Sequence, residues 1–166
     1  MQNIILIGMP ASGKSTVGVI LAKLLAYDFI DTDLVIQKHE GSRLKDIIEN
    51  RGIDGFLAAE EAACMSIQAE HCVIATGGSV VYSEAAMKHL KALGRVVYLK
   101  AEYSALFGRL QDIRGRGVVL RSGQTLADLY NERAPLYEKY ADIIISEDSG
   151  GLEDKVAKVF NACTKE

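Results

Sequence analysis

The feature that most constrains this chain is a glycine-rich segment that lies between a short apolar run and an amphipathic segment. Gly8–Thr16 reads G-M-P-A-S-G-K-S-T and fits G-x-x-x-x-G-K-[ST] at every fixed position. The run Ile4–Ile7 before it is typical of a strand buried on both faces. Lys14–Ala26 after it repeats apolar residues at three and four, as a helix does. A strand, a glycine-rich turn and a helix N-terminus form a cradle for phosphate, because backbone N–H groups and the helix dipole point at the anion.

The parts of this cradle have separate predicted roles toward ATP. We expect Lys14 to reach the β- and γ-phosphates and to act in catalysis, and Ser15 to bind Mg²⁺. The predicted nucleotide-binding residues of the loop are Gly8, Pro10, Ala11, Ser12, Gly13, Lys14, Ser15 and Thr16. The loop indicates a nucleotide-binding superfamily rather than a reaction. The chain has no N-K-x-D motif, which a GTPase would use to bind its base.

Strand-like and helix-like segments alternate along the chain. We expect strands at 4–7, 29–31, 72–75, 95–99 and 143–145, and helices at 14–26, 34–40, 44–50, 56–70, 84–93, 103–110, 125–140 and 152–163. Such alternation predicts βαβ units and a parallel sheet. We therefore expect an α/β, three-layer P-loop NTPase fold: a five-stranded parallel sheet with helices on both faces and a mobile lid. All of it fits one domain over residues 1–166.

The net charge, the short apolar run and the spacing of the cysteines limit which binding partners and which cellular compartment we expect. The 166 residues carry a formal net charge of −3, which does not favour general nucleic-acid binding. Ile4–Ile7 is too short for a signal peptide or a membrane span. The three cysteines form no metal-ligand spacing, as in many reduced cytosolic proteins. We expect a cytoplasmic monomer that acts on a small molecule, without nucleic-acid or membrane partners.

Two acids follow the second predicted strand, at the edge where parallel sheets bind ligands. In Asp31-Thr32-Asp33 the acids point in different directions on extended backbone, so one can face Mg²⁺ and the other an acceptor hydroxyl. A carboxylate in the second position can accept the hydroxyl proton during phosphoryl transfer. Their early position favours a kinase of small molecules or nucleotides. In the alternative interpretation, Asp33 caps the helix 34–40.

A basic, glycine-rich segment follows the helix predicted at 103–110. Arg109, Arg114, Arg116 and Arg121 alternate there with glycines. Arginine offers a planar fork suited to phosphate, and glycine-rich segments can close over a substrate. We interpret 111–123 as a lid that delivers an arginine to the transferred phosphate. The alternative is a solvated basic loop.

In this order, the motifs resemble the shikimate kinase family over nearly the whole chain. Asp31-Thr32-Asp33 resembles the family's D-x-D, Thr76-Gly77-Gly78 its T-G-G-G turn, and Arg133–Tyr137 its R-x-P-x-Y. The resemblance implies ATP-dependent phosphorylation of shikimate to shikimate 3-phosphate, with Mg²⁺ supported by Asp31 and Ser15. It also implies a substrate-binding region at 33–62. The implied residues are Asp33 for the acceptor hydroxyls, Arg133 for its carboxylate, Gly77, Gly78 and Ser79 for substrate, Arg116 for catalysis and Arg109 for adenine.

Three positions depart from the family pattern. Leu57 replaces the arginine of F-R-x-x-E, which helps to bind the shikimate carboxylate. Ser79 replaces the third glycine of T-G-G-G, and Gly117 stands where R-P-L-L has proline. The nucleotide side is kept while the acceptor and lid motifs are changed. Two alternatives therefore stay open: a related kinase for a different small alcohol, and a nucleotide-binding homologue without catalysis.

Overall fold

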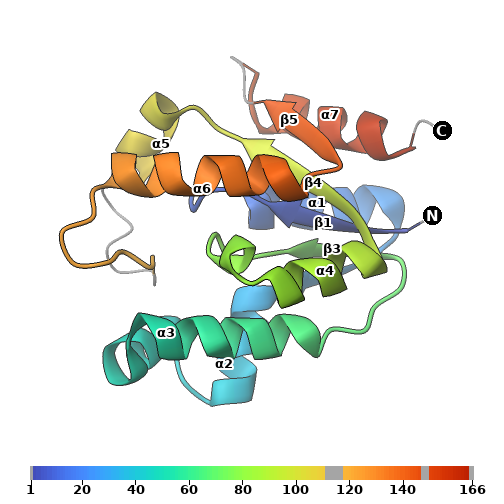
Figure 1. Ribbon diagram of the computed structural model, residues 1–166. Coiled ribbons are helices and arrows are strands. Elements are labelled where there is room, and N and C mark those ends of the chain that lie inside the picture. Colours follow the sequence, from blue (N-terminus) through green and yellow to red (C-terminus); the bar gives the residue numbers. More distant parts are fainter. Residues whose placement is uncertain (1, 111–117, 147–149, 165–166) are drawn as a thin grey trace.

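A parallel five-stranded sheet forms the centre of the molecule. The computed structural model describes residues 2–110, 118–146 and 150–164 (Figure 1). The strands are β1 (Asn3–Ile7), β2 (Asp28–Asp31), β3 (Cys72–Ala75), β4 (Gly94–Lys100) and β5 (Ile143–Ser146). They lie in the order β2-β3-β1-β4-β5, and every neighbouring pair is parallel. The predicted number, positions and direction of the strands are confirmed.

Helices connect the strands and cover the sheet. They are α1 (Lys14–Leu25), α2 (Thr32–Glu40), α3 (Leu44–Met65), the 3₁₀ turn η1 (Val80–Tyr82), α4 (Glu84–Leu93), α5 (Tyr103–Leu110), α6 (Leu126–Tyr140) and α7 (Leu152–Thr164). In Figure 1, β5 and α7 lie at one end of the molecule and α2 and α3 at the other. Within the described ranges, no helix has both the length and the apolar character needed to cross a membrane.

Alternate residues of β1 point into two separate hydrophobic cores. Ile5 and Ile7 belong to the core formed with α4 and α6, whereas Ile4 and Leu6 belong to the core formed with α1 and α7. All five residues of the strand are buried. Because both faces of the sheet are covered, Ile4–Ile7 form a continuous apolar run rather than an alternating one. The three-layer arrangement is therefore confirmed, and β1 delivers the glycine-rich loop at the middle of the sheet.

The helix boundaries differ from the prediction around α2 and α3. Asp31 caps α2, so this helix begins at Thr32 rather than at Leu34. The two helices predicted at 44–50 and 56–70 form one element, α3, with a break at Gly52, whose φ is 70° and ψ is −177°. This left-handed φ favours glycine, which explains the break. The element ends at Met65, earlier than predicted.

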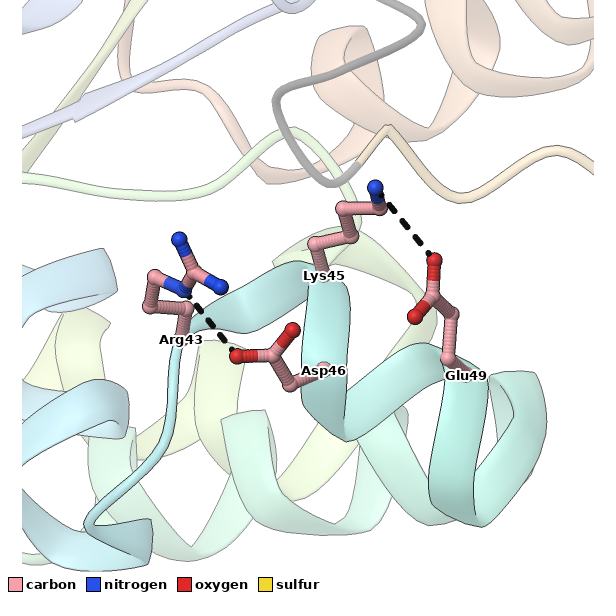
Figure 2. A network of polar contacts seen from close by, with 4 residues as sticks. All are labelled: Arg43, Lys45, Asp46 and Glu49. Carbon is pink, nitrogen blue, oxygen red and sulfur yellow. Dashed lines mark hydrogen bonds and ion pairs between the residues drawn. The ribbon is translucent and has the colours of Figure 1, made fainter.

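Two exposed ion pairs support the first turns of α3 (Figure 2). Arg43 Nε lies 3.0 Å from Asp46 Oδ2, and Lys45 Nζ lies 3.5 Å from Glu49 Oε1. Pairs at these helix spacings contribute about 0.2–0.5 kcal/mol each in water, so they bias the local conformation without dominating it. Leu44, between the two basic residues, lines the cavity described below.

Candidate active site

The side chain of Lys14 bonds to the backbone of the glycine-rich loop that contains it. Lys14 Nζ donates hydrogen bonds to the carbonyl oxygens of Gly8 at 2.9 Å and Met9 at 2.8 Å. A Cβ at Gly8 would lie 2.7 Å from the carbonyl oxygen of Leu99, so the loop can pass β4 only with glycine there. Burial lowers the pKa of Lys14 to about 8, although the charge of Asp33 opposes this shift. The ammonium is therefore charged at neutral pH and held where phosphate would arrive.

Ser15 and Asp31 meet beside this loop. Ser15 Oγ donates a hydrogen bond of 2.8 Å to Asp31 Oδ2. The other oxygen of Asp31 accepts the backbone N–H of Asp33 at 3.0 Å and so caps α2. The interpretation of Asp33 as the helix cap is thus wrong, because Asp31 fills that position. This capping bond fixes the Asp31 carboxylate next to Ser15.

Asp33 lies in the first turn of α2, and its carboxyl group faces the same cavity as the loop. Burial raises its pKa to about 6, and the neighbouring charge of Asp31 adds to this shift while Lys14 opposes it. At neutral pH the group is mostly ionised, with a pKa close enough to neutrality for proton transfer. This combination suits a general base.

One cavity of about 480 Å³ joins the loop to the predicted acceptor residues. Of the predicted site residues, those that line it are Pro10, Ala11, Gly13, Lys14, Ser15, Thr16, Asp33, Gly77, Gly78, Ser79, Arg109 and Arg133. Gly8 and Ser12 belong to the loop without lining the cavity, and Asp31 reaches it through Ser15. Arg114, Arg116 and Gly117 lie outside the described residues.

The turn after β3 comes so close to its neighbours that side chains are excluded. A Cβ at Gly77 would lie 2.6 Å from Glu60 Oε1 and 3.1 Å from Asp33 Oδ1. A Cβ at Gly78 would lie 2.8 Å from Pro10 Cδ and 3.0 Å from Arg133 Nη1. The turn thus brings backbone, carboxyl groups and an arginine into contact at one wall of the cavity.

Arg133 is almost completely buried, with 1% of its surface exposed, yet it lines the cavity. Its Nε donates to Tyr82 Oη at 3.2 Å and its Nη2 to the carbonyl oxygen of Val119 at 3.1 Å. Tyr137, four residues further along α6, donates to the carbonyl oxygen of Gly78 at 2.6 Å. The arginine is therefore fixed in position before any ligand binds, and its charge is turned toward the cavity wall.

Sequence reasoning did not assign these supporting residues. Tyr137 belongs to the R-x-P-x-Y motif, and its spacing of four from Arg133 on one helix could have suggested a shared task. Tyr82 lies on η1, which was not predicted, and no motif in the sequence pointed to it.

The departures at positions 57 and 79 have different structural consequences. Leu57 is partly buried against the apolar cluster that contains Ile36, Ile47 and Phe56, and it does not line the cavity. Ser79 is buried, and its Oγ donates a hydrogen bond of 2.6 Å to Glu60 Oε2. Glu60 was also unassigned by sequence, although it is the acid at the end of Phe56–Glu60. Gly117 lies outside the described residues.

Comparison with known proteins decides the family. The profile described as "Shikimate kinase" matches residues 10–164. The chain belongs to the shikimate kinase family. A shikimate kinase of Thermodesulfovibrio yellowstonii is 36% identical over 162 residues, which cover 96% of this chain and 93% of that protein. A shikimate kinase of Clostridium botulinum is 39% identical over 151 residues, which cover 87% of each.

Solved structures of shikimate kinases share the fold over nearly the full length. The Acinetobacter baumannii enzyme in complex with shikimate is 31% identical, with a TM-score of 0.88 over 98% of this chain and 93% of that one. The Aquifex aeolicus enzyme is also 31% identical, with a TM-score of 0.84 over 97% of this chain and 95% of that one. A sugar kinase from Janibacter, 13% identical with a TM-score of 0.60, shares the fold alone. The predicted P-loop kinase fold and the family are thus confirmed, and ATP is the phosphate donor that this family uses.

Proposed function

We propose that this chain transfers the γ-phosphoryl group of ATP to a hydroxyl group of shikimate, giving ADP and shikimate 3-phosphate. The observation that carries this proposal is the single cavity that joins Lys14 of the glycine-rich loop to Asp33 and Arg133. A phosphate group and a small anionic alcohol can therefore meet within one site. Phosphoryl transfer depends mainly on such positioning and on electrostatic stabilisation.

The chain's own residues supply the parts of this reaction. Asp33 orients the acceptor hydroxyl and takes its proton as the new oxygen–phosphorus bond forms. The bond from the γ-phosphorus to the bridging oxygen breaks at the same time, and Lys14 neutralises the charge that develops on ADP. Arg109, which also lines the cavity, would lie beside the adenine base. The catalytic role of Arg116 stays a sequence-based prediction.

The oxygen atoms of Ser15 and Asp31 fit a Mg²⁺ ion. Their contact at 2.8 Å places a hydroxyl and a carboxylate side by side next to the loop. Among the described residues no group of three or more His, Cys, Asp or Glu could hold a metal. A small donor set is what Mg²⁺ needs beside ATP, because phosphates and water supply its other ligands. When bound there, Mg²⁺ would neutralise phosphate charge.

At the acceptor end, Arg133 would hold the carboxylate of shikimate and the turn Gly77–Ser79 would border the ring. The charge and the fixed fork of Arg133 suit a carboxylate. Residues 33–62 would supply most of the remaining acceptor contacts through Asp33, Leu44 and Phe56. We assign all of these tasks to one kinase domain over residues 1–166.

The test is coupled ADP release with a panel of acceptors: shikimate, quinate, gluconate, homoserine and nucleoside monophosphates. We expect ATP and Mg²⁺ to support turnover with shikimate at ordinary kinase rates of about 1–100 s⁻¹. The absence of any response to shikimate at millimolar concentration would exclude the proposed acceptor.

The same panel separates the two other functions. Other alcohols belong in the panel because Leu57 stands where the family pattern has an arginine. Among the described residues that line the cavity, Arg133 is present but no second arginine lies beside Glu60 to bind a carboxylate. Faster turnover with another alcohol would reassign the acceptor while keeping the kinase. ATP binding without acceptor-stimulated ADP release would identify a homologue without catalysis.

A further inference from the structure

The proposed mechanism leaves one buried acid of the cavity without a task. Glu60, on α3, lines the cavity with only 2% of its surface exposed. Its Oε2 accepts the hydrogen bond from Ser79, whereas its Oε1 has no hydrogen-bond partner within the described residues. A buried carboxyl oxygen without a partner is costly when charged, so its presence calls for a ligand or a proton.

The surroundings of Glu60 contain charges but no ion pair. The ionisable groups that act on it come from three other elements, namely Lys14 of α1, Asp33 of α2 and Arg133 of α6, and Cys64 lies near it on its own helix. In the described part of the chain, none of the salt bridges includes Glu60. Lys14 is instead bound to loop carbonyls, and Arg133 to Tyr82 and Val119. Both cations are thus already engaged elsewhere.

The family pattern has an arginine at position 57, where this chain has Leu57, so one cation near Glu60 is absent. Position 57 precedes Glu60 by three residues on α3, and residues at this spacing are neighbours on a helix. An arginine there could pair with Glu60, but Leu57 packs into an apolar cluster instead. Ser79, which replaces a glycine of the pattern, supplies the hydrogen bond that Glu60 receives. Glu60 thus has the hydroxyl of Ser79 as its partner instead of an arginine.

We propose that protonation of Glu60 is coupled to binding of the acceptor's carboxylate. This inference rests on the proposed function, since it concerns the acceptor of that reaction. A Cβ at Gly77 would lie 2.6 Å from Glu60 Oε1 and 3.1 Å from Asp33 Oδ1, so an anionic acceptor enters a site that already holds two neighbouring carboxyl groups, one buried and one half-buried. Asp33 must be ionised to act as a base, and Glu60 is free to take the proton from solvent.

Electrostatics determines the direction of the coupling. Burial raises the pKa of Glu60 to about 7, and the Ser79 hydrogen bond opposes this shift. A carboxylate held at Arg133 adds negative charge nearby and disfavours ionised Glu60 further. Above neutral pH each bound acceptor therefore draws one proton onto Glu60, and the acceptor keeps its own charge. Affinity for shikimate then falls as pH rises.

Titration calorimetry with shikimate, in buffers of different ionisation enthalpy, counts this proton directly. We expect uptake approaching one proton per shikimate near pH 8 and much less near pH 6. The Kd should rise by up to about tenfold per pH unit above neutrality. Glu60→Gln should abolish most of this proton uptake and most of the rise in Kd above neutrality. The smaller pH dependence of Kd that Asp33 and Lys14 contribute should persist. Glu61→Gln, which removes an exposed carboxylate from the next position of α3, should behave as the parent does.

Ser79→Ala provides a second, independent variant. The Ser79 hydroxyl favours ionised Glu60, so its removal should move the rise in Kd to higher pH. This measurement and the parent's proton count still decide the matter if Glu60→Gln fails to fold. A pH-independent Kd without proton uptake, alongside normal shikimate turnover, would overturn this inference alone. Shikimate that neither binds nor turns over at any pH would overturn the proposed function and this inference with it.

Discussion

The two ends of the cavity are built in different ways. At the nucleotide end, one continuous segment, Gly8–Thr16, carries the loop, its lysine and its serine, and the lysine bonds the loop's own carbonyls. At the acceptor end, Asp33, Glu60, Ser79 and Arg133 come from four separate parts of the chain. A change to one residue of the continuous loop disturbs the others, because they bond to one another. A wall assembled from distant elements can change one residue while the others stay.

The two ends also differ in how they hold charge. The cation of the loop is held by backbone oxygens, whatever the neighbouring side chains are. Of the acids at the acceptor end, Glu60 is buried and Asp33 half-buried, and desolvation raises the pKa of Asp33 to about 6 and of Glu60 to about 7. Substitutions at the nucleotide end should therefore alter turnover with every acceptor. Substitutions at the acceptor end should alter selectivity, apart from the catalytic base.

The largest effect is expected from Asp33→Asn. This change removes the base and keeps the shape, so kcat should fall by about 10²–10⁴-fold. ATP binding, measured by calorimetry, should change little because Asp33 lies at the acceptor end. Asp46→Asn, on the exposed surface of α3, is the matched control (Figure 2). Loss of ATP binding in Asp33→Asn would mean that the two ends are not separable as described.

Lys14→Met should lower kcat by about 10²–10³-fold with every acceptor, because it removes the cation that stabilises the transferred phosphate. Initial rates with two different acceptors would check that the loss is uniform. Lys45→Met removes an exposed lysine from α3 and should leave these rates unchanged. A loss confined to shikimate would contradict the assignment of Lys14 to the nucleotide end.

Arg133→Lys should raise the KM for shikimate by about 10–100-fold and leave the KM for ATP nearly constant. The substitution keeps the charge but loses the planar fork, and a charge-assisted hydrogen bond contributes about 1.5–3 kcal/mol. Steady-state kinetics with each substrate varied in turn measures the split. An equal rise in both KM values would indicate a general disturbance of the fold, since Arg133 also bonds Tyr82 and Val119.

Leu57→Arg should lower the KM for shikimate by up to about tenfold. The new cation can pair with Glu60 or with the acceptor carboxylate from one turn away on α3. Leu57→Met, which keeps an apolar side chain of similar volume, separates the charge from the loss of packing. An unchanged or higher KM for shikimate in Leu57→Arg would show that the acceptor end is shaped for a different alcohol.

The last effect is expected on folding rather than on turnover. The folded-state pKa of Glu60 is raised from 4.5 to about 7, so its contribution to stability is fully present below about pH 4.5 and is lost as pH rises through 7. Glu60→Gln should therefore increase the free energy of unfolding near pH 8 by about 2–3 kcal/mol relative to its effect near pH 4. Urea denaturation at both pH values measures this difference. Equal effects at the two pH values would mean that ionised Glu60 does not destabilise the folded state.

Much of the molecule was predictable because the signals are local. The apolar run of β1, the glycines of the loop and the period of α1 each determine structure within a few residues. The alternation of elements then predicts a parallel sheet, since sequential parallel strands need helical crossovers. Asp31 was placed correctly at the end of β2, but the extended backbone expected through Asp33 was wrong, because Asp31 caps α2 and Asp33 already lies in the first turn of that helix.

The sequence by itself determined the phosphate loop, the five parallel strands and the family, because each depends on neighbouring residues or on the order of motifs. Tertiary structure alone decided that Ser79 bonds Glu60, that Leu57 turns into an apolar cluster and that Arg133 is fixed by Tyr82. Glu60 and Ser79 are 19 residues apart, and Arg133 and Tyr82 are 51 apart. Contacts of this kind form only when the sheet brings its loops to one edge, and burial there then shifts the pKa values of the acids.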